Sequence, residues 1–322
     1  MKSFAKLNLF LHVVSKRGSY HEIESLAVFL PDLSDEIKIK KAKENETIFV
    51  GPHSAGISLE SNTVKKVLDL ASQSILDKFS VTITKNIPQG AGLGGGSSNA
   101  ACVLKYLSKK YSLSAEITNK IAIKVGADVP MFMYGRAACI GGIGEQILPL
   151  QTKLPKLFAV VVYPDKPINT AQVYGLGGFD FNLNLNWIPA FAGMTRGEAI
   201  SSIELMPMSV QLRNKGLTKF VIPAKAGIQP ELLMSIGKYA ASLINFLQYT
   251  HNDLYPNSLK LLPELEPLLL ELQNLPQCLL SRMTGSGSAC FALFSDLKTA
   301  QRASDSLQKK FTRYSIYISR VK

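Results

Sequence analysis

A glycine-rich segment between a predicted strand and a predicted helix has the composition of an anion-binding loop. It reads Pro88-Gln-Gly-Ala-Gly-Leu-Gly-Gly-Gly-Ser-Ser-Asn-Ala-Ala101 and holds five glycines within Gly90–Gly96. Glycine tolerates positive φ and lets backbone N–H groups approach an anion closely. Ser97 and Ser98 follow where N-capping residues are expected, at the positive end of a helix dipole. These features predict a phosphate-binding loop at the start of a helix, in preference to a flexible turn.

Three well-known nucleotide-binding motifs do not describe this loop. Gly90, Gly92 and Gly95 satisfy G-x-G-x-x-G, and Glu116 lies about 20 residues further on, as in dinucleotide-binding proteins. Glu116, however, belongs to a helical stretch and does not end a second strand. A Walker A loop requires lysine where Gly96 stands, and the Val-Ala-Ile-Lys and His-Arg-Asp patterns of protein kinases are absent. We therefore predict a nucleotide-phosphate loop of another kind.

Polar residues in three other segments could serve the same site. Lys6 and Asn8 interrupt the apolar run Ala5–Leu11, and at a period of two they point to the same side of a strand. Asp128 follows a predicted helix, between small and apolar neighbours. Thr284–Ala289 is a second glycine-rich turn that leads into a strand.

The elements around these residues predict an α+β fold without regular βαβ alternation. Strands are expected where apolar residues alternate or form short runs, and helices where they recur at helical spacing. The expected strands cover 36–40, 80–84, 158–163 and 289–294, and the expected helices cover 62–79, 97–111, 114–125, 232–247 and 259–272.

Residues 182–230 do not fit this pattern. Two short runs, Ile188–Gly193 and Ile222–Gly227, share Ile-Pro-Ala-x-Ala-Gly, which is too short for a solenoid repeat. Prolines punctuate the stretch, and it has no periodicity. We interpret it as an inserted surface excursion, which costs little because closure entropy grows only slowly with loop length. A substrate lid is the alternative.

Composition excludes several classes of protein. The chain has 322 residues, 46% of them hydrophobic, and four cysteines. This is enough for two domains with buried cores, and it argues against disorder. The longest apolar run, Leu157–Tyr163, falls far short of the ~20 residues of a membrane span. There is no leader pattern and no Cys-x-x-Cys pair. We expect a soluble, cytoplasmic protein without a disulfide scaffold or a thiolate metal site.

A formal net charge of +12 raises the possibility of a nucleic-acid partner. Half of that excess lies in residues 298–322, which carry seven basic side chains and one acid, Asp305. Nucleic-acid surfaces usually interleave aromatic residues with charges. Here Tyr314 and Tyr317 alternate with Ile316 and Ile318 as in a strand. The tail is interpreted as a solvated helix followed by an edge strand.

The order of these motifs resembles that of the GHMP kinase superfamily over most of the chain, apart from about 182–230. The resemblance implies a two-domain fold with the active site between the domains: an ATP-binding domain over 1–155, similar to a ribosomal-protein fold, and an α+β sandwich over 156–322. The segments that carry it are Ala5–Leu9, Tyr20-His21, Pro88–Ala101, Gly126–Pro130, Gly142–Glu145, Asn252–Leu254 and Gly285–Ala289.

What the resemblance implies about activity is a phosphoryl transfer from ATP, with Mg²⁺, to the 2-hydroxyl of a cytidine-diphosphate-linked methylerythritol, in non-mevalonate isoprenoid synthesis. Asp128 resembles the base that accepts the hydroxyl proton. Lys6 resembles the cation that keeps Asp128 ionised and stabilises charge at the reacting centre. No residue is assigned as a metal ligand. The ATP-binding residues implied are Pro88, Gln89, Gly90, Ala91, Gly92, Leu93, Gly94, Gly95, Gly96, Ser97 and Ser98.

The resemblance also implies a nucleoside pocket. Tyr20 resembles the residue that stacks on cytosine, His21 the one that hydrogen-bonds the base, and Tyr174 a second stacking wall, while Asn8 faces the substrate. The family usually shows Arg-x-Asp-Gly-Tyr-His. This chain reads Arg17-Gly-Ser-Tyr-His21, one residue shorter and without the aspartate.

Three alternatives remain open at this point. The chain could be another GHMP kinase that acts on mevalonate, homoserine or a sugar alcohol. It could bind nucleic acid, as its charge suggests, although we expect no nucleic-acid or membrane partner. It could also be a degraded or regulatory pseudo-kinase. We expect a monomer or a weak homodimer.

Overall fold

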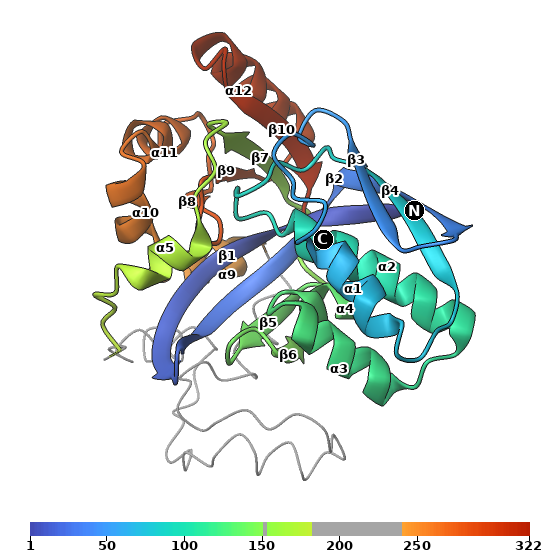
Figure 1. The fold of residues 1–322 in the computed structure, drawn as a ribbon. Helices are drawn as coiled ribbons and strands as arrows, with labels where there is room; N and C mark the ends of the chain where they lie inside the picture. The colour runs from blue at the N-terminus through green and yellow to red at the C-terminus, as the bar shows by residue number, and fades with distance from the viewer. Residues whose placement is uncertain (151–152, 182–239) are drawn as a thin grey trace.

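The computed structural model describes residues 1–150, 153–181 and 240–322, which form two β-sheets with helices packed against them (Figure 1). Five strands of the six-stranded sheet have the order β3-β4-β2-β5-β6. The sixth strand, β1, pairs with β2 and lies off this path. The four-stranded sheet has the order β10-β7-β9-β8. The excursion expected at 182–230 lies outside the described residues, and so do residues 232–239 of one expected helix.

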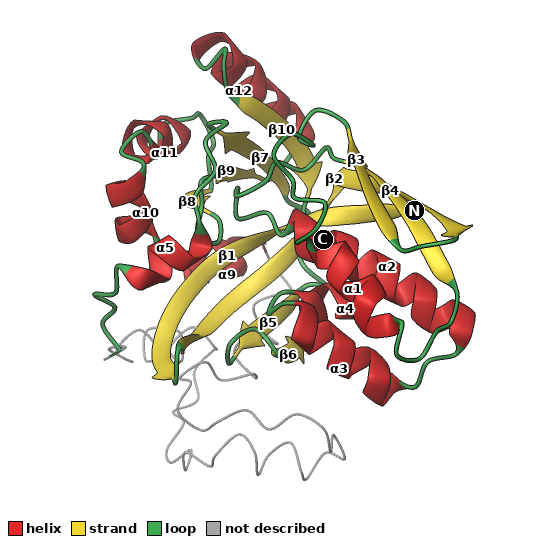
Figure 2. Cartoon of the chain, in the orientation of Figure 1, coloured by secondary structure: helices red, strands yellow, loops and turns green. Residues whose placement is uncertain are grey.

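Figure 2 shows how helices and strands are distributed along the chain. The strands are β1 (Lys2–Arg17), β2 (Tyr20–Ala42), β3 (Glu46–Val50), β4 (Lys78–Thr84), β5 (Ala138–Gly141), β6 (Gln146–Pro149), β7 (Phe158–Tyr163), β8 (Leu280–Met283), β9 (Cys290–Phe294) and β10 (Ser315–Arg320). The helices are α1 (Thr63–Ala71), α2 (Gly95–Tyr111), α3 (Ala115–Val125), α4 (Val129–Tyr134), α5 (Thr170–Gly175), α9 (Ala240–Gln248), α10 (Tyr255–Leu261), α11 (Leu265–Gln273) and α12 (Leu297–Lys310).

The two sheets divide along the sequence. Every strand of the six-stranded sheet ends before residue 150, and every strand of the four-stranded sheet begins after residue 157. Helices α1 to α4 gather on the first sheet, whereas α11 and α12 pack on the second (Figure 1). This arrangement supports a domain boundary near residue 155, which remains a proposal. None of the helices among the described residues has the length and apolarity that a membrane crossing requires.

Two expected helices are wrong in their extent. The helix expected over 62–79 ends at Ala71, and Lys78 and Phe79 belong to β4 instead, where they pair with β2. Ile75 is buried in the turn that connects α1 to β4. Its spacing from the apolar residues of α1 therefore indicated a buried side chain, but the helix does not extend to it. The pattern at 259–272 is two helices, α10 and α11, separated at Pro263, which has no N–H to donate. The expected helices at 97–111 and 114–125 and the four expected strands are confirmed.

A β-bulge in β1 decides which side chains face the site. The pairing of β1 with β2 shifts between Asn8 and Phe10, so that Leu9 has no partner residue. A bulge of this kind reverses which face the following side chains occupy. Lys6 and Asn8 therefore share their face with Leu11, while Phe10 and His12 turn to the opposite face. The expectation that Lys6 and Asn8 lie on one side is confirmed.

Arg282 on β8 joins the two sheets at this bulge. Its guanidinium is buried and donates to the carbonyl oxygen of Leu9 at 2.6 Å and to that of Thr250 at 2.7 Å. Burial lowers its pKa from 12.5 to about 10, so it stays charged at neutral pH. A second link lies at the chain end, where Phe29 and Lys322 exchange two backbone hydrogen bonds. The residues before and after position 150 are thus held together by one buried arginine side chain and by a pair of main-chain hydrogen bonds.

The basic tail is a helix and an edge strand, as expected. It forms α12 and β10, and β10 lies at one edge of the four-stranded sheet. The seven basic side chains of residues 298–322 are all exposed. Half of the charge excess therefore lies on a solvated surface.

Glu24 on β2 should make the stability of this fold depend on pH. Its side chain is 6% exposed, and within the described part of the chain one carboxylate oxygen has no hydrogen-bond partner. Burial raises its pKa from 4.5 to about 7. Because the folded state then binds the proton more tightly than the unfolded state, stability is greatest below about pH 4.5 and falls as pH rises through 7, by about 3 kcal/mol. Urea unfolding at pH 5.5 and pH 8 should show about 2 kcal/mol of this loss, because the part between pH 4.5 and 5.5 has then already occurred. Glu24→Gln should abolish the difference. If the wild type and Glu24→Gln lost the same free energy of unfolding between these two pH values, Glu24 would not be the group responsible.

Candidate active site

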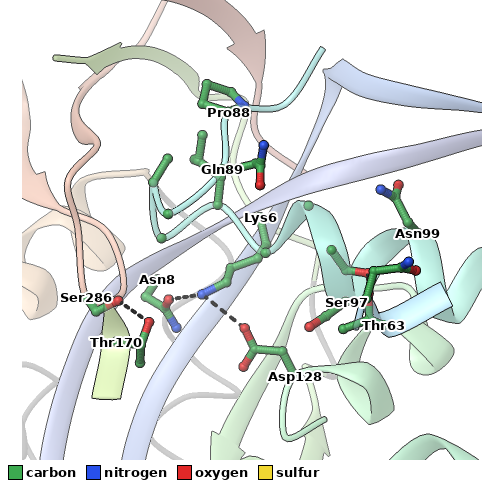
Figure 3. Close-up of a pocket in the computed structure, with 18 of the residues that line it drawn as sticks. Lys6, Asn8, Thr63, Pro88, Gln89, Ser97, Asn99, Asp128, Thr170 and Ser286 are labelled. Atoms are coloured by element: carbon green, nitrogen blue, oxygen red, sulfur yellow. Dashed lines mark hydrogen bonds and ion pairs between the residues drawn. The ribbon is translucent and has the colours of Figure 1, made fainter. Parts of the chain in front are cut away.

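A cavity of about 410 Å³ lies where the two sheets meet (Figure 3). The first half of the chain contributes Lys6, the glycine-rich loop and Asp128 to its wall. The second half contributes Thr170, Tyr174 and Ser286. The wall therefore combines a cation, a carboxylate, hydroxyl groups and loop backbone in one space.

Lys6 and Asp128 meet in the wall of this cavity. The Lys6 ammonium lies 3.5 Å from a carboxylate oxygen of Asp128. The Lys6 side chain is 6% exposed and that of Asp128 is 39% exposed, so the carboxylate is the accessible member of the pair. Asp128 directly precedes α4, and its side chain makes no capping hydrogen bond to that helix. Figure 3 shows it turned toward the cavity and toward Lys6.

Asn8 holds Lys6 in place. Its amide oxygen accepts a short hydrogen bond from the Lys6 ammonium, and its amide nitrogen donates to Ser25 at 2.7 Å. The backbone N–H of Asn8 donates to the hydroxyl of Thr284 at 2.9 Å. Asn8 thus orients the cation within the cavity wall, and its expected contact with the substrate remains a prediction.

The glycine-rich loop adopts the conformation that only glycine takes without strain. Gly90, Gly92 and Gly94 have φ of 58°, 74° and 69°. Helix α2 begins directly after Gly94, and no side chain caps it. Since the first N–H groups of a helix have no partner within the helix, the start of α2 can donate them to an anion.

The expectation that Ser97 and Ser98 are N-capping residues is wrong. The N-cap is Gly94, and both serines lie within the first turn of α2. The positive φ of Gly94 lets the helix begin before the serines. Ser97 still faces the cavity, whereas Ser98 is buried and its N–H donates to the Gly94 carbonyl.

The second glycine-rich turn packs directly behind the first. A Cβ on Gly92 would lie 2.1 Å from the carbonyl oxygen of Thr284. Backbone N–H groups of Ser288 and Ala289 donate to the carbonyl oxygens of Gly90 and Ala91 at 3.2 and 3.1 Å. The turn therefore holds the phosphate loop through main-chain contacts.

Asn252 also supports that turn. Its amide donates to the carbonyl oxygens of Met283 and Gly285, at 2.8 Å in each case. Its own oxygen accepts from the N–H of Leu254. Asn252 therefore has a structural role: it holds the second glycine-rich turn and does not itself belong to the phosphate loop.

Lys85 is a cavity residue that sequence reasoning missed. It directly follows β4, and its ammonium makes a short hydrogen bond to the fully buried Asp35. Burial lowers the pKa of Lys85, while Asp35 opposes that shift. Asp35 also accepts N–H bonds from Asn86 and Ile87, at 2.7 and 2.8 Å. The pair fixes the chain where it enters the phosphate loop; a lysine between a strand and that loop was the available signal.

Aromatic rings gather beyond Asp128. His21 and Tyr174 stack with ring centroids 5.1 Å apart and planes 23° apart, and Phe179 meets His21 edge-on at 5.1 Å. Burial, and then the charge of Lys16, lowers the pKa of His21 below 6.5, so its ring is neutral at neutral pH. Tyr20 is 63% exposed, and its stacking role remains a prediction. Phe179 was not predicted, because it stands in a glycine-flanked segment without periodicity.

The hairpin that carries His21 is fastened to the β5–β6 turn. Arg17, at the end of β1, forms ion pairs with Glu22 and with Glu145, the latter at 2.9 Å. Glu145 in turn accepts the N–H of Ile143 at 2.7 Å. The Arg17–Glu22 pair therefore spans the shortened loop, and the Arg17–Glu145 pair ties it to the β5–β6 turn.

The cavity brings together most of the predicted residues but not all of them. Tyr20, His21 and Ser98 do not line it, although His21 stacks on Tyr174, which does. The hydroxyl of Thr63 donates to the Gly96 carbonyl, and those of Thr170 and Ser286 lie 2.7 Å apart. Thr63 and Thr170 were not predicted, whereas Ser286 belongs to the second glycine-rich turn that the sequence singled out. The predicted residues that line the cavity are Lys6, Asn8, Pro88, Gln89, Gly90, Ala91, Gly92, Leu93, Gly94, Gly95, Gly96, Ser97, Asp128 and Tyr174.

Comparison with known proteins extends this description to the whole chain. Residues 62–136 match the GHMP kinases N terminal domain, and residues 235–313 match the GHMP kinases C terminal family. A protein of Chelativorans sp. named 4-diphosphocytidyl-2-C-methyl-D-erythritol kinase is 30% identical over 313 residues, which are 95% of this chain and 90% of that protein. A protein of the same name from Anaplasma marginale is 31% identical over 97% of this chain and 93% of its own length. The crystal structure of a 4-(cytidine 5'-diphospho)-2C-methyl-D-erythritol kinase superimposes with a TM-score of 0.66 at 26% identity, covering 100% of this chain and 98% of the other.

Proposed function

Because this chain belongs to the GHMP kinases, we propose that it transfers the terminal phosphoryl group of ATP to the 2-hydroxyl of 4-diphosphocytidyl-2-C-methyl-D-erythritol, in isoprenoid precursor synthesis. The observation that carries this proposal is the Lys6–Asp128 pair, which lies in the same cavity as the phosphate loop and Tyr174. A base, a cation, a phosphate cradle and an aromatic wall are the parts that such a transfer requires.

Asp128 acts as the base in this proposal. Its carboxylate accepts the proton of the 2-hydroxyl as the hydroxyl oxygen forms its bond to the γ-phosphorus, and the bond from that phosphorus to ADP breaks. Lys6 offsets the negative charge on Asp128 and on the transferring group. Its burial and its hydrogen bond to Asn8 keep the ammonium in one orientation, so little reorganisation is needed during the reaction.

The phosphates are held by the loop and the start of α2. Three loop glycines with positive φ and the first N–H groups of α2 offer donors that carry no formal charge. The net charge of the chain is not required for this recognition, and half of it lies on the remote α12 and β10 surface.

The same wall has oxygen donors suited to the Mg²⁺ that accompanies ATP. Mg²⁺ is usually bound through one or two carboxylates together with substrate phosphates and water. Among the described residues that line the cavity, Asp128 is the one carboxylate, and Ser97 adds a hydroxyl. These two residues would hold the ion, which when bound neutralises charge on the phosphate oxygens.

The nucleoside end of the substrate belongs at the aromatic cluster of His21, Tyr174 and Phe179. A neutral imidazole offers one donor and one acceptor nitrogen, which suits the edge of cytosine. Burial, and then the charges of Asp128 and Asp253, raise the pKa of Tyr174 above its usual value, so its ring stays a neutral stacking surface. We propose that the base takes the place of His21 against the face of Tyr174, and that the His21 ring turns so that its nitrogens meet the edge of the base.

The test is turnover with defined acceptors. Purified protein with ATP and Mg²⁺ should release ADP when 4-diphosphocytidyl-2-C-methyl-D-erythritol is supplied, and phosphorus NMR should place the new phosphate on the 2-oxygen. Mevalonate, homoserine and galactose, tested in parallel, should give no more than background. Turnover of one of these in place of the cytidine compound would favour another GHMP kinase activity. No turnover with any acceptor would overturn the proposal.

Tyr174→Ala should raise KM for the cytidine substrate about 5- to 150-fold, since stacking on an aromatic side chain contributes about 1–3 kcal/mol per base. KM for ATP should change little. Tyr174→Phe keeps the aromatic face and should behave as the wild type. Steady-state kinetics with each substrate varied separately would measure both constants. Equal increases in the two KM values would show that Tyr174 supports the cavity generally and does not bind the base.

A further inference from the structure

Two histidines and an aspartate converge outside the proposed kinase site. His12 lies on β1, and His251 and Asp253 lie in the segment between α9 and α10. Their potential ligand atoms all lie within 4.8 Å of one another. One oxygen of Asp253 is 3.2 Å from Nδ1 of His12 and 2.7 Å from Nε2 of His251. The imidazole rings meet edge to face, with centroids 4.6 Å apart.

The proposed phosphoryl transfer does not use these side chains. Leu11 and Leu254, the chain neighbours of His12 and Asp253, line the kinase cavity, whereas His12, His251 and Asp253 do not. The bulge at Leu9 turns His12 to the face away from Lys6 and Asn8. The cluster therefore lies outside the kinase cavity, although His12 and Asp253 are each the chain neighbour of a residue that lines it.

Main-chain hydrogen bonds hold the three residues in register. The N–H of Leu11 donates to the carbonyl of His251 at 3.0 Å, and the N–H of Asp253 donates to the carbonyl of Leu11 at 2.9 Å. The second carboxylate oxygen of Asp253 accepts the N–H of Val13 at 2.7 Å. Outer hydrogen bonds of this kind orient metal ligands in known sites. The first carboxylate oxygen is thereby aimed at the two imidazoles.

We propose that His12, His251 and Asp253 form a binding site for Zn²⁺. Tetrahedral zinc ligands at about 2.0–2.1 Å from the ion lie about 3.3 Å apart. The 3.2 Å between His12 and Asp253 is close to this value, whereas the 2.7 Å between His251 and Asp253 is a hydrogen-bond distance that has to lengthen when zinc binds. Imidazole donors favour zinc over magnesium or calcium, which prefer oxygen. The His12 side chain is 7% exposed and that of His251 is 69% exposed, so the site is closed on one side and open to a water ligand on the other.

Zinc at this position would link two parts of the chain. His12 comes from the six-stranded sheet, and the other two ligands come from the segment that also carries Asn252 and so supports the second glycine-rich turn. Binding replaces the histidine–aspartate hydrogen bonds, and any proton on the ligating nitrogens passes to solvent. The expected effect is stabilisation of the fold without a role in the chemical step.

Zinc binding is tested on tag-free, chelator-stripped protein in the absence of nucleotide, so that the result is independent of kinase activity. Calorimetric titration should saturate at one Zn²⁺ per chain, and zinc should raise Tm. Co²⁺ should give the visible absorption of a four-coordinate site. His251→Gln, at an exposed position that folding tolerates, should weaken zinc binding more than about tenfold, because even outer-shell changes have effects of that size. His53→Gln, at a histidine that hydrogen-bonds Tyr317, is the matched control and should leave the affinity unchanged.

Two results would overturn the zinc site. One is wild-type protein that shows no saturable zinc binding. The other is His251→Gln protein that binds zinc as tightly as the wild type, which would assign the binding to other groups. Circular dichroism of each variant verifies that the comparison is made between folded proteins.

Discussion

Asp128→Asn should lower kcat about 10²- to 10⁴-fold, the range that general acid–base groups contribute. The amide has nearly the same shape as the carboxylate, but it cannot accept the 2-hydroxyl proton and has no charge to pair with Lys6 at 3.5 Å. KM for the cytidine substrate should change little, because the proposed nucleoside site is at His21 and Tyr174 and not at Asp128. Single-turnover measurement of phosphoryl transfer isolates the chemical step.

Two companion variants sharpen this result. Asp69→Asn changes an exposed carboxylate on α1 that pairs only with Lys65 among the ion pairs described here, and it should leave kcat unchanged. Lys6→Met should lower kcat as strongly as Asp128→Asn, and the double variant should be little worse than either, because the two groups act as one unit. A kcat for Asp128→Asn within threefold of the wild type would remove Asp128 from the role of base.

Gly92→Ala should damage both the stability and the phosphate loop. At φ of 74° any side chain is strained, which costs about 1–2 kcal/mol. The new Cβ would also lie 2.1 Å from the Thr284 carbonyl oxygen, a backbone atom that cannot rotate away. Overpacking of this kind costs about 1–3 kcal/mol more. Because one loop would have to move off the other, we expect kcat/KM for ATP to fall about 10²-fold, as a misplacement near 1 Å can cause.

Two glycine controls separate strain from collision. Gly56 has φ of 77° with open space where a Cβ would stand, so Gly56→Ala should show the strain alone. Gly96→Ala, at the start of α2, would meet only the Thr63 hydroxyl at 3.5 Å and should keep the stability of the wild type. Guanidinium unfolding compares the three variants. If Gly92→Ala were no less stable than Gly56→Ala, the close contact between the two glycine-rich turns would not contribute to the stability of the fold.

Much of the fold was predictable because apolar spacing reports burial. The alternation at 36–40 and 80–84 identified parts of β2 and β4, and the apolar faces of 97–111 and 114–125 identified α2 and α3. The same signal misled where burial occurs without a helix. Ile75 is buried in a turn, and the residues just after it join a strand because β2 supplies the hydrogen bonds.

The candidate site was predictable to the extent that its chemistry depends on residue type. Five glycines before a helix, a lysine in an apolar strand and an aspartate after a helix each had few uses other than chemistry. The capping role of Ser97 and Ser98 was wrong, because a glycine at positive φ started α2 earlier than the serines. Lys85 and Phe179 carried only weak local signals, since their roles depend on residues distant in sequence.

By itself, the sequence determined the glycine loop, Lys6 and Asp128 as candidate site residues in an α+β fold, because backbone freedom and ionisable groups are properties of residue type. The activity of a phosphotransferase came from the resemblance that the order of these motifs carries. Only the tertiary structure decided that Thr284 closes against Gly92 and that Arg282 satisfies the bulged Leu9. It also decided that His12, His251 and Asp253 converge away from the cavity. Each of these contacts joins residues far apart in the chain. Local spacing does not encode such contacts, since they follow from how the two sheets pack.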